Sequence, residues 1–220
     1  MYNKTKMDKI YTFGDLENIQ SFILSLKRKA NKLGVTLQLD NKKHIEITDN
    51  IKVCGFFMER IGRIPGILAT ATGLSIAEWL PILVHESCHM DQWQEKISLW
   101  KECGKLPEEI IDNWIEGKNY TKKTVEHAIK ITRNLELDCE QRAVKKIKRF
   151  NLPINIDEYI QRANVYLFFH NWVLLKRKWY NTQNEPFTNQ KIYGLMNKDW
   201  YESYDEMPPL LLKAFKKYKI

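Results

Sequence analysis

The sequence predicts an α+β protein with a small N-terminal sheet and a mainly helical C-terminal half. Short stretches in which apolar and polar residues alternate follow one another between residues 35 and 72. Apolar residues recur at helical spacing before and after these stretches, most extensively beyond residue 75. The chain has 220 residues, 44% of them hydrophobic, which is enough for one large domain or for two lobes around a shared cleft.

The first element should be a helix from Asp15 to Leu33, because apolar side chains recur every three or four residues and Gly34 follows as a stop signal. Strands and turns should follow it. The Asp49-Asn50 pair is typical of a turn between two of these strands. The expected strands are residues 35–39, 44–48, 53–58 and 67–72.

A second helix should begin at Ser75, which stands three residues before Glu78 in the pattern of a capping box. Its apolar stripe continues to Trp100, and Gly104 ends it. Pro81 lies within the stripe. Because proline lacks the amide proton of an interior helical position, the helix either kinks at Pro81 or begins near it.

Beyond this helix the chain should be mainly helical. We expect helices at residues 107–116, 121–150, 157–180, with Asp157 as the cap, and 210–219. The expected organisation is a single domain over residues 1–220. Its upper α+β lobe spans about 1–103 and its lower helical lobe about 104–220.

The formal net charge is +8, and the lysine and arginine clusters, including 145–149, lie at expected helix ends. Cations at a helix C-terminus complement the helix dipole and solvate the surface. We therefore do not expect nucleic acid as a partner. The basic N-terminus lacks the apolar run of a signal peptide, and no segment approaches the roughly 20 apolar residues of a membrane-spanning helix. A cytoplasmic protein without a membrane span is expected.

The four cysteines are spread through the chain without a C-x-x-C pair. This excludes zinc-finger spacing and argues against a disulfide framework. Cys88 and Cys139 fall inside two expected helices, where we interpret them as small buried side chains.

The clearest motif is H-E-x-x-H at residues 85–89, which follows an apolar segment. Residues four apart share one face of a helix, so His85 and His89 would present their imidazoles to a common point. This is the geometry of two ligands of one Zn²⁺ ion, with Glu86 beside the open position of the metal.

Several residues compete for the third ligand position. Glu95 lies ten residues after His85, as in a metzincin. The glycine that such a site needs is replaced by Gln92, however, and the helix should continue, so Glu95 would point away. His127 has no supporting pattern around it and is interpreted as a surface residue of its helix.

A better candidate lies in residues 135–143, where Glu136 and Glu140 are four apart and share a helix face. Glu136 would bind zinc, while Glu140 would accept the outer N–H of a ligand histidine and fix its tautomer. Asp138 is a competing ligand only if the helix is rotated. The alternative is a solvated acidic face with Arg133 and Arg142 nearby.

The pair H-E-x-x-H and Glu136-x-x-x-Glu140 resembles a gluzincin metallopeptidase of the thermolysin-like clan. Residues 135–143 are also similar to the E-x-x-A-D helix of membrane-associated gluzincins and to the acidic helix of ImmA/IrrE-type peptidases. The resemblance covers the two helices, about a quarter of the chain, and Glu140 replaces the usual aspartate. It implies a zincin-like fold in which a twisted sheet and its helix pack on the H-E-x-x-H helix.

The resemblance implies that an edge strand of the sheet pairs with an extended peptide substrate, and residues 67–72 are the candidate edge. It also implies an oxyanion-stabilising residue from the lower lobe. His170, on the apolar side of its helix with Tyr166 one turn before it, fits this role; a buried histidine of the core is the alternative.

The predicted function is therefore a zinc-dependent peptidase acting on a peptide or protein substrate. Zinc would polarise the substrate carbonyl and activate water, with Glu86 as general base. The alternative is a zinc-containing binding or regulatory module that cleaves nothing and has a protein or nucleic-acid partner. The presence of Glu86 argues against this alternative, because a structural zinc site needs no general base.

Overall fold

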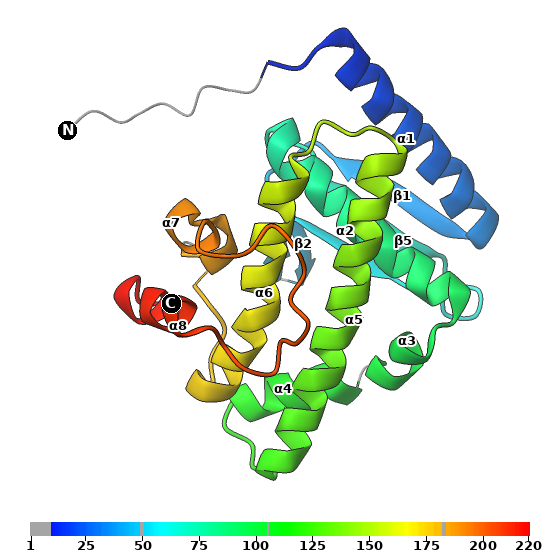
Figure 1. Ribbon diagram of the computed structural model, residues 1–220. Coiled ribbons are helices and arrows are strands. Elements are labelled where there is room, and N and C mark those ends of the chain that lie inside the picture. The colour runs from blue at the N-terminus through cyan, green and yellow to red at the C-terminus, as the bar shows by residue number, and fades with distance from the viewer. Residues whose placement is uncertain (1–9, 49–50, 105, 182–183) are drawn as a thin grey trace. The chain divides into compact units, whose positions relative to one another are not determined.

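The computed structural model describes residues 10–48, 51–104, 106–181 and 184–220 (Figure 1). The chain divides into two compact units. The first comprises Met1–Gln94 and Lys145–Ile154, and the second comprises Glu95–Val144 and Asn155–Ile220. The boundary after Gln94 thus precedes the expected one at 103, and a segment from later in the chain joins the first unit.

The first unit begins with helix α1, Phe13–Leu33. Thr12 caps it: its hydroxyl accepts the amide proton of Asp15, and the Asp15 carboxylate accepts that of Thr12. Gly34, at φ 68°, ends the helix in the left-handed conformation that glycine adopts most readily. The helix buries four apolar side chains on one face: Ile19, Phe22, Leu26 and Ala30.

Three strands form a mixed sheet in the order β1-β5-β4. β1 (Val35–Asp40) pairs parallel to β5 (Gly66–Ala71), and β4 (Gly55–Met58) pairs antiparallel to β5. β2 (Ile45–Thr48) and β3 (Ile51–Val53) form a separate antiparallel pair. The expected strand at 53–58 is thus two strands, and the expected turn at Asp49-Asn50 lies outside the described residues.

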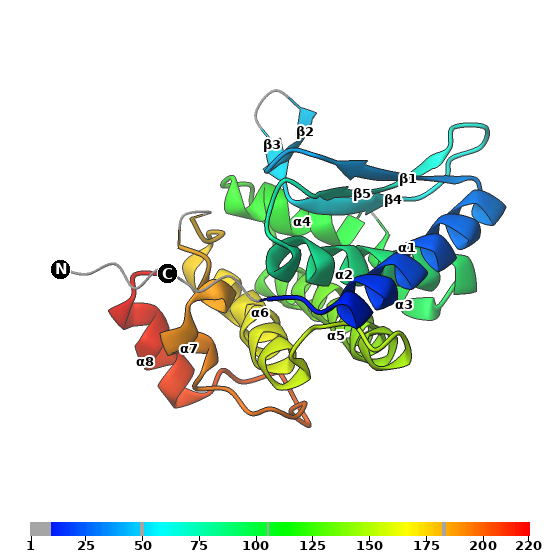
Figure 2. The same cartoon turned by 90° about the horizontal axis from the view of Figure 1, so that it is seen from above.

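The prediction that residues 67–72 form an edge strand is wrong, because β5 lies between β1 and β4. Five of its six residues are buried, as is typical of a strand with neighbours on both sides. Figure 2 shows α1 and α2 on the same face of this sheet.

Helix α2, Ile76–Glu95, carries the H-E-x-x-H motif and runs through Pro81 without a break in the assigned helix. At its start the Glu78 carboxylate accepts hydrogen bonds from the amide and the hydroxyl of Ser75. The single helix expected to reach Trp100 is in fact two. Lys96, at φ 51°, ends α2, and α3 (Ser98–Cys103) follows.

The second unit is helical. α5 (Lys122–Arg149) begins and ends within one residue of its predicted bounds, and its last five residues belong to the first unit. α6 (Ile156–Lys176) is capped by Asn155, not by Asp157, and ends at Arg177, which is left-handed. The other elements are α4 (Leu106–Ile115), the 3-10 helix η1 (Pro186–Thr188), α7 (Gln190–Tyr193) and α8 (Pro209–Lys217).

The core of the second unit is rich in aromatic side chains. α5 and α6 run side by side (Figure 1), and the Arg133 guanidinium on α5 donates to the Asn171 amide oxygen on α6 at 2.6 Å. Phe168, Phe169, Trp172 and Phe215 are buried among the aliphatic residues of this core. The α+β class predicted from the sequence is confirmed.

The four cysteines, all within the described residues, form no disulfide, and Cys88 and Cys139 are buried, as predicted. None of the helices in the described part of the chain combines the length and the hydropathy that a membrane crossing requires.

Candidate metal centre

The structure brings the two histidines of the motif together on one face of α2. His89 is buried, and His85 and Glu86 are half-buried. The Nε2 atoms of His85 and His89 lie 3.1 Å apart, with ring planes at 84° to each other. Two nitrogens at about 2.0–2.1 Å from a tetrahedral zinc ion lie roughly 3.3 Å apart. The pair therefore has nearly the spacing that two zinc ligands need.

His89 is held in this orientation by Gln92. The Nδ1 atom of His89 lies 2.8 Å from the Gln92 side-chain oxygen. An amide oxygen only accepts hydrogen bonds, so Nδ1 carries the proton and the Nε2 lone pair faces His85. Gln92 is fully buried, so this hydrogen bond is shielded from water.

Sequence reasoning missed this role of Gln92, which it treated only as the residue replacing a metzincin glycine. A signal was present: an amide three residues after a ligand histidine lies on the same helix face and can reach its ring. The residue predicted to fix a histidine tautomer was Glu140, and that role stays a prediction.

Glycine at position 55 lets α2 approach β4 closely beside the motif. A Cβ atom at Gly55 would lie 2.5 Å from the Ile82 side chain and 3.4 Å from Cγ of Glu86. Any side chain at position 55 would therefore push the helix from the strand. Glu86 thus lies against β4, which is one edge of the three-stranded sheet.

A cluster of ion pairs around the buried Asp91 lies on the opposite side of the helix from the two histidines. The Asp91 carboxylate lies 2.8 Å from the ammonium groups of both Lys29 and Lys146. Lys146 also donates to the hydroxyl of Ser87 at 2.7 Å, one turn before Asp91. The side chain of Lys146 is 17% exposed. The interpretation of 145–149 as a solvated basic cluster is therefore wrong for Lys146, whose charge is needed to pair with a buried aspartate.

Within the second unit, Glu136 and Glu140 are both buried, although isolated carboxylates rarely are. The hydroxyl of Tyr159 on α6 donates a hydrogen bond to Glu140. Glu108 is exposed overall, yet desolvation of its carboxyl and the negative charges of Glu136 and Asp112 raise its pKa to about 6. Negative charge therefore gathers around Glu136.

The same negative charges also affect the pKa of the Cys103 thiol. Burial, followed by the charge of Glu108 and then that of Glu136, raises the pKa of its thiol to about 11. A thiol with this pKa is neutral at physiological pH and a poor nucleophile. Cys103 is therefore a packing residue.

The two carboxylates considered as competing ligands, Glu95 and Asp138, share one partner. Arg142 lies 2.7 Å from Glu95 and 2.6 Å from Asp138, so both acids are ion-paired. His127 is exposed on α5, as the sequence predicted.

His170 is almost completely buried on α6, 1% exposed, with the ring of Tyr166 at 5.1 Å and that of Trp179 at 6.4 Å. Its Nδ1 donates to the Tyr166 carbonyl at 3.1 Å, and its Nε2 has no hydrogen-bond partner in the described part of the chain. Burial lowers its pKa to about 4, so the ring is neutral. A ring with its only proton on Nδ1 presents a lone pair, not a donor, at Nε2.

Comparison of the chain with protein-family models, with curated proteins and with solved structures gives no match.

Proposed function

We propose that the chain is a zinc-dependent peptidase in which His85 and His89 hold one zinc ion and Glu86 acts as the general base. The observation that carries the proposal is the His85–His89 pair itself. Its Nε2 atoms lie 3.1 Å apart, and the Nδ1–H group of His89 is already committed to Gln92. Neutral imidazole nitrogens are ligands that suit zinc.

In the metal-free chain, a proton on the Nε2 atom of His85 can form a hydrogen bond to the Nε2 lone pair of His89. Zinc binding would displace this proton, so the two rings would exchange one shared proton for a metal ion. Orientation of the rings would then cost little, because the hydrogen bond from His89 to Gln92 persists in both states.

The third ligand we propose is Glu136 of α5. Its support is the buried carboxylate itself and the negative charge gathered around it, which a cation would neutralise. Cys139 is the alternative on the same helix, since His85, His89 and Cys139 are a set of side chains that could hold a metal ion. A thiolate would also suit zinc, so the metal proposal holds with either donor.

Bound zinc would polarise the substrate carbonyl and acidify a water molecule. Glu86, the residue after His85, would take the proton from that water and deliver it to the leaving amine. His170 fits the predicted oxyanion role only with its proton on Nε2, because the bond from Nδ1 to Tyr166 leaves a lone pair at Nε2.

β4 is better suited than residues 67–72 to receive an extended peptide. It is an edge of the sheet, and its Gly55 lies against Glu86. A peptide added to this edge would pair with the backbone of β4 and run beside the general base. A peptide or protein substrate and a cytoplasmic location stay predictions.

The test is Glu86→Gln, with the exposed Glu17→Gln on α1 as the matched control. We expect Glu86→Gln to keep the zinc content of the wild type and to lose hydrolysis of a mixed peptide library by about 10²–10⁴-fold, the usual contribution of a general base. Glu17→Gln should cleave like the wild type. A wild type that binds zinc but cleaves no peptide would instead support the non-catalytic binding module.

A further inference from the structure

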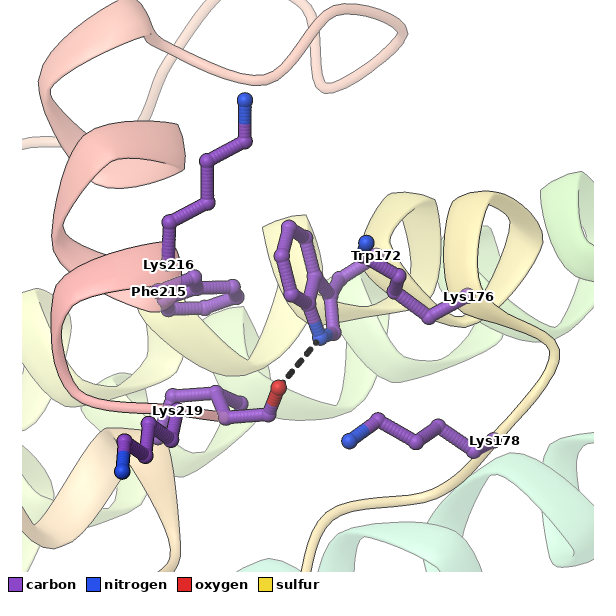
Figure 3. A pocket seen from close by; sticks show the side chains of 7 residues that line it. Trp172, Lys176, Lys178, Phe215, Lys216 and Lys219 are labelled. Atoms are coloured by element: carbon purple, nitrogen blue, oxygen red, sulfur yellow. Dashed lines mark hydrogen bonds between the residues drawn. The ribbon is translucent and has the colours of Figure 1, made fainter.

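The lysines around the hollow between the ends of α6 and α8 do not converge on a common point (Figure 3). Lys216 and Lys219 extend away from each other, and the Ile220 carbonyl lies in the hollow, where it accepts the indole N–H of Trp172 at 3.1 Å. Lysines that diverge in this way are a solvated basic surface. Within the first unit, by contrast, two lysines from different helices converge on one carboxylate.

This carboxylate is that of Asp91, which is buried on α2 two residues after His89. One of its oxygens lies 2.8 Å from the ammonium of Lys29 on α1, and the other lies 2.8 Å from that of Lys146 on α5. All three residues belong to the first unit, because the last five residues of α5 are part of it. Asp91 therefore connects α2 to two other helices.

Charge balance alone does not explain why Asp91 has two lysine partners. Moving an ammonium group out of water costs free energy, and Lys146 is the more buried of the two, with 17% of its side chain exposed against 39% for Lys29. A buried ion pair adds little net stability, and the best-established benefit of such pairs is that they fix which surfaces meet. The pairing of Lys146 is therefore explained by position and not by stability.

Lys146 is attached to α2 at two points. Besides its ion pair with Asp91, its ammonium donates to the hydroxyl of Ser87 at 2.7 Å, and Ser87 lies one turn before Asp91. Ser87 is fully buried, and its hydroxyl donates to the Val84 carbonyl at 2.7 Å, which fixes its orientation. Two acceptors one turn apart define both the height of Lys146 along α2 and the direction from which it approaches.

The segment that follows α5 is anchored separately, on α1. The rings of Phe22 and Phe150 meet edge to face, with centroids 5.2 Å apart, and the side-chain amide of Asn18 donates to the Asn151 carbonyl at 3.1 Å. These contacts do not depend on the charge of Lys146. We therefore expect the end of α5 to stay in the first unit when that charge is removed.

The same helix carries both candidates for the third zinc ligand. α5 runs without a break over Lys122–Arg149, and Cys139 lies seven residues before Lys146. Seven residues are nearly two full turns, so these two side chains share one face of the helix, about 10 Å apart along its axis. Glu136 lies one turn further along. A contact that fixes the rotation of α5 at Lys146 therefore also fixes which way Cys139 and Glu136 face.

We propose that Lys146 is a positioning residue for zinc binding. Through Ser87 and Asp91 it sets the rotation of α5 relative to α2, and thus the direction of the third ligand that α5 supplies. Its two contacts lie on the opposite side of α2 from the histidines, so Lys146 acts through the helix and not on the metal. The inference rests on the proposed function, because it requires a zinc ligand on α5.

The test compares Lys146→Met with Lys29→Met, which removes a lysine from the same carboxylate but on a helix without a proposed ligand. Each variant leaves Asp91 one ammonium partner, so urea unfolding of the metal-free proteins should show both to be folded. Competition with a chromophoric chelator then measures zinc affinity. We expect Lys146→Met to bind zinc about 10–100-fold more weakly, the usual cost of losing a group that orients a ligand, and Lys29→Met to bind it like the wild type.

A second measurement separates positioning from a general loss of stability. If Lys146 acts through the third ligand, its effect should nearly disappear when that ligand is already absent, in Glu136→Ala or, if the thiol is the ligand, in Cys139→Ala. Three results would overturn the inference and leave the zinc site in place: equal weakening in both lysine variants, no weakening in Lys146→Met, or a full effect of Lys146→Met without the third ligand. A wild type that binds no zinc would overturn the proposed function, and this inference with it.

Discussion

His89 and His170 are both buried histidines whose Nδ1 donates a hydrogen bond within its own helix, to Gln92 and to Tyr166 respectively. Their second nitrogens differ. The Nε2 of His89 lies 3.1 Å from another imidazole nitrogen, whereas no partner faces the Nε2 of His170 in the described residues. A fixed tautomer is therefore common to a candidate ligand and to a core histidine. What distinguishes the candidate ligand is that its second ring nitrogen lies close to another nitrogen that can bind the same metal ion.

The largest effect that separates these two histidines should appear in the pH dependence of stability. The folded pKa of His170, about 4, is below its ordinary value of 6.5. Between these values the unfolded chain binds a proton that the folded chain does not, so the free energy of unfolding rises with pH across this window. Above about pH 6.5 the neutral His170 ring adds about 3 kcal/mol to the free energy of unfolding, compared with its contribution at about pH 4. This stabilisation is lost as the pH falls towards 4.

Urea unfolding of the metal-free protein at pH 7 and pH 4.5 measures how the free energy of unfolding changes between these two pH values. The difference between the two pH values should be about 2 kcal/mol smaller in His170→Leu than in the wild type. The exposed His127→Leu should keep the wild-type difference. An unchanged difference in His170→Leu would show that the Nε2 of His170 is hydrated or paired in solution.

A smaller effect, on zinc affinity, should follow from replacing Gln92. Gln92→Leu removes the acceptor for the Nδ1–H group of His89 and should weaken zinc affinity about 10–100-fold, the usual effect of losing such a partner. Gln92→Glu keeps an acceptor at this position and should restore the affinity. Competition with a chromophoric chelator measures both, with the exposed Gln94→Leu as the control. Wild-type affinity in Gln92→Leu would mean that the His89 ring needs no such support.

The helices were predictable from local signals. α1 and α5 lie within two residues of their predicted bounds, because helix-ending signals such as Gly34 act through the backbone of their own segments. The break at Lys96 was not predictable, since nothing in the local pattern interrupts the apolar stripe before Trp100. The order of the strands in the sheet was not predictable either. An apolar run such as residues 67–72 shows that a strand is buried but not which strands lie beside it.

The H-E-x-x-H motif of the candidate site was predictable, whereas most of the contacts that hold the motif in place were not. Four-residue spacing is enough to bring the imidazoles of His85 and His89 together on a helix. The roles of Gly55 and Lys146 depend on contacts with residues far along the chain, which no local pattern encodes. Gln92 lies between these cases, because its contact with His89 is local but its burial depends on residues elsewhere in the chain.

The zinc content of purified protein tests the central claim most directly. After dialysis, metal analysis should find about one zinc ion per wild-type chain and per chain of His127→Ala, in which only an exposed histidine is lost. His85→Ala should contain almost none, and Glu136→Ala should lose zinc if the carboxylate is the third ligand. Loss in Cys139→Ala instead of Glu136→Ala would move that ligand to the thiol. Full zinc occupancy in His85→Ala, or no zinc in the wild type, would contradict the account.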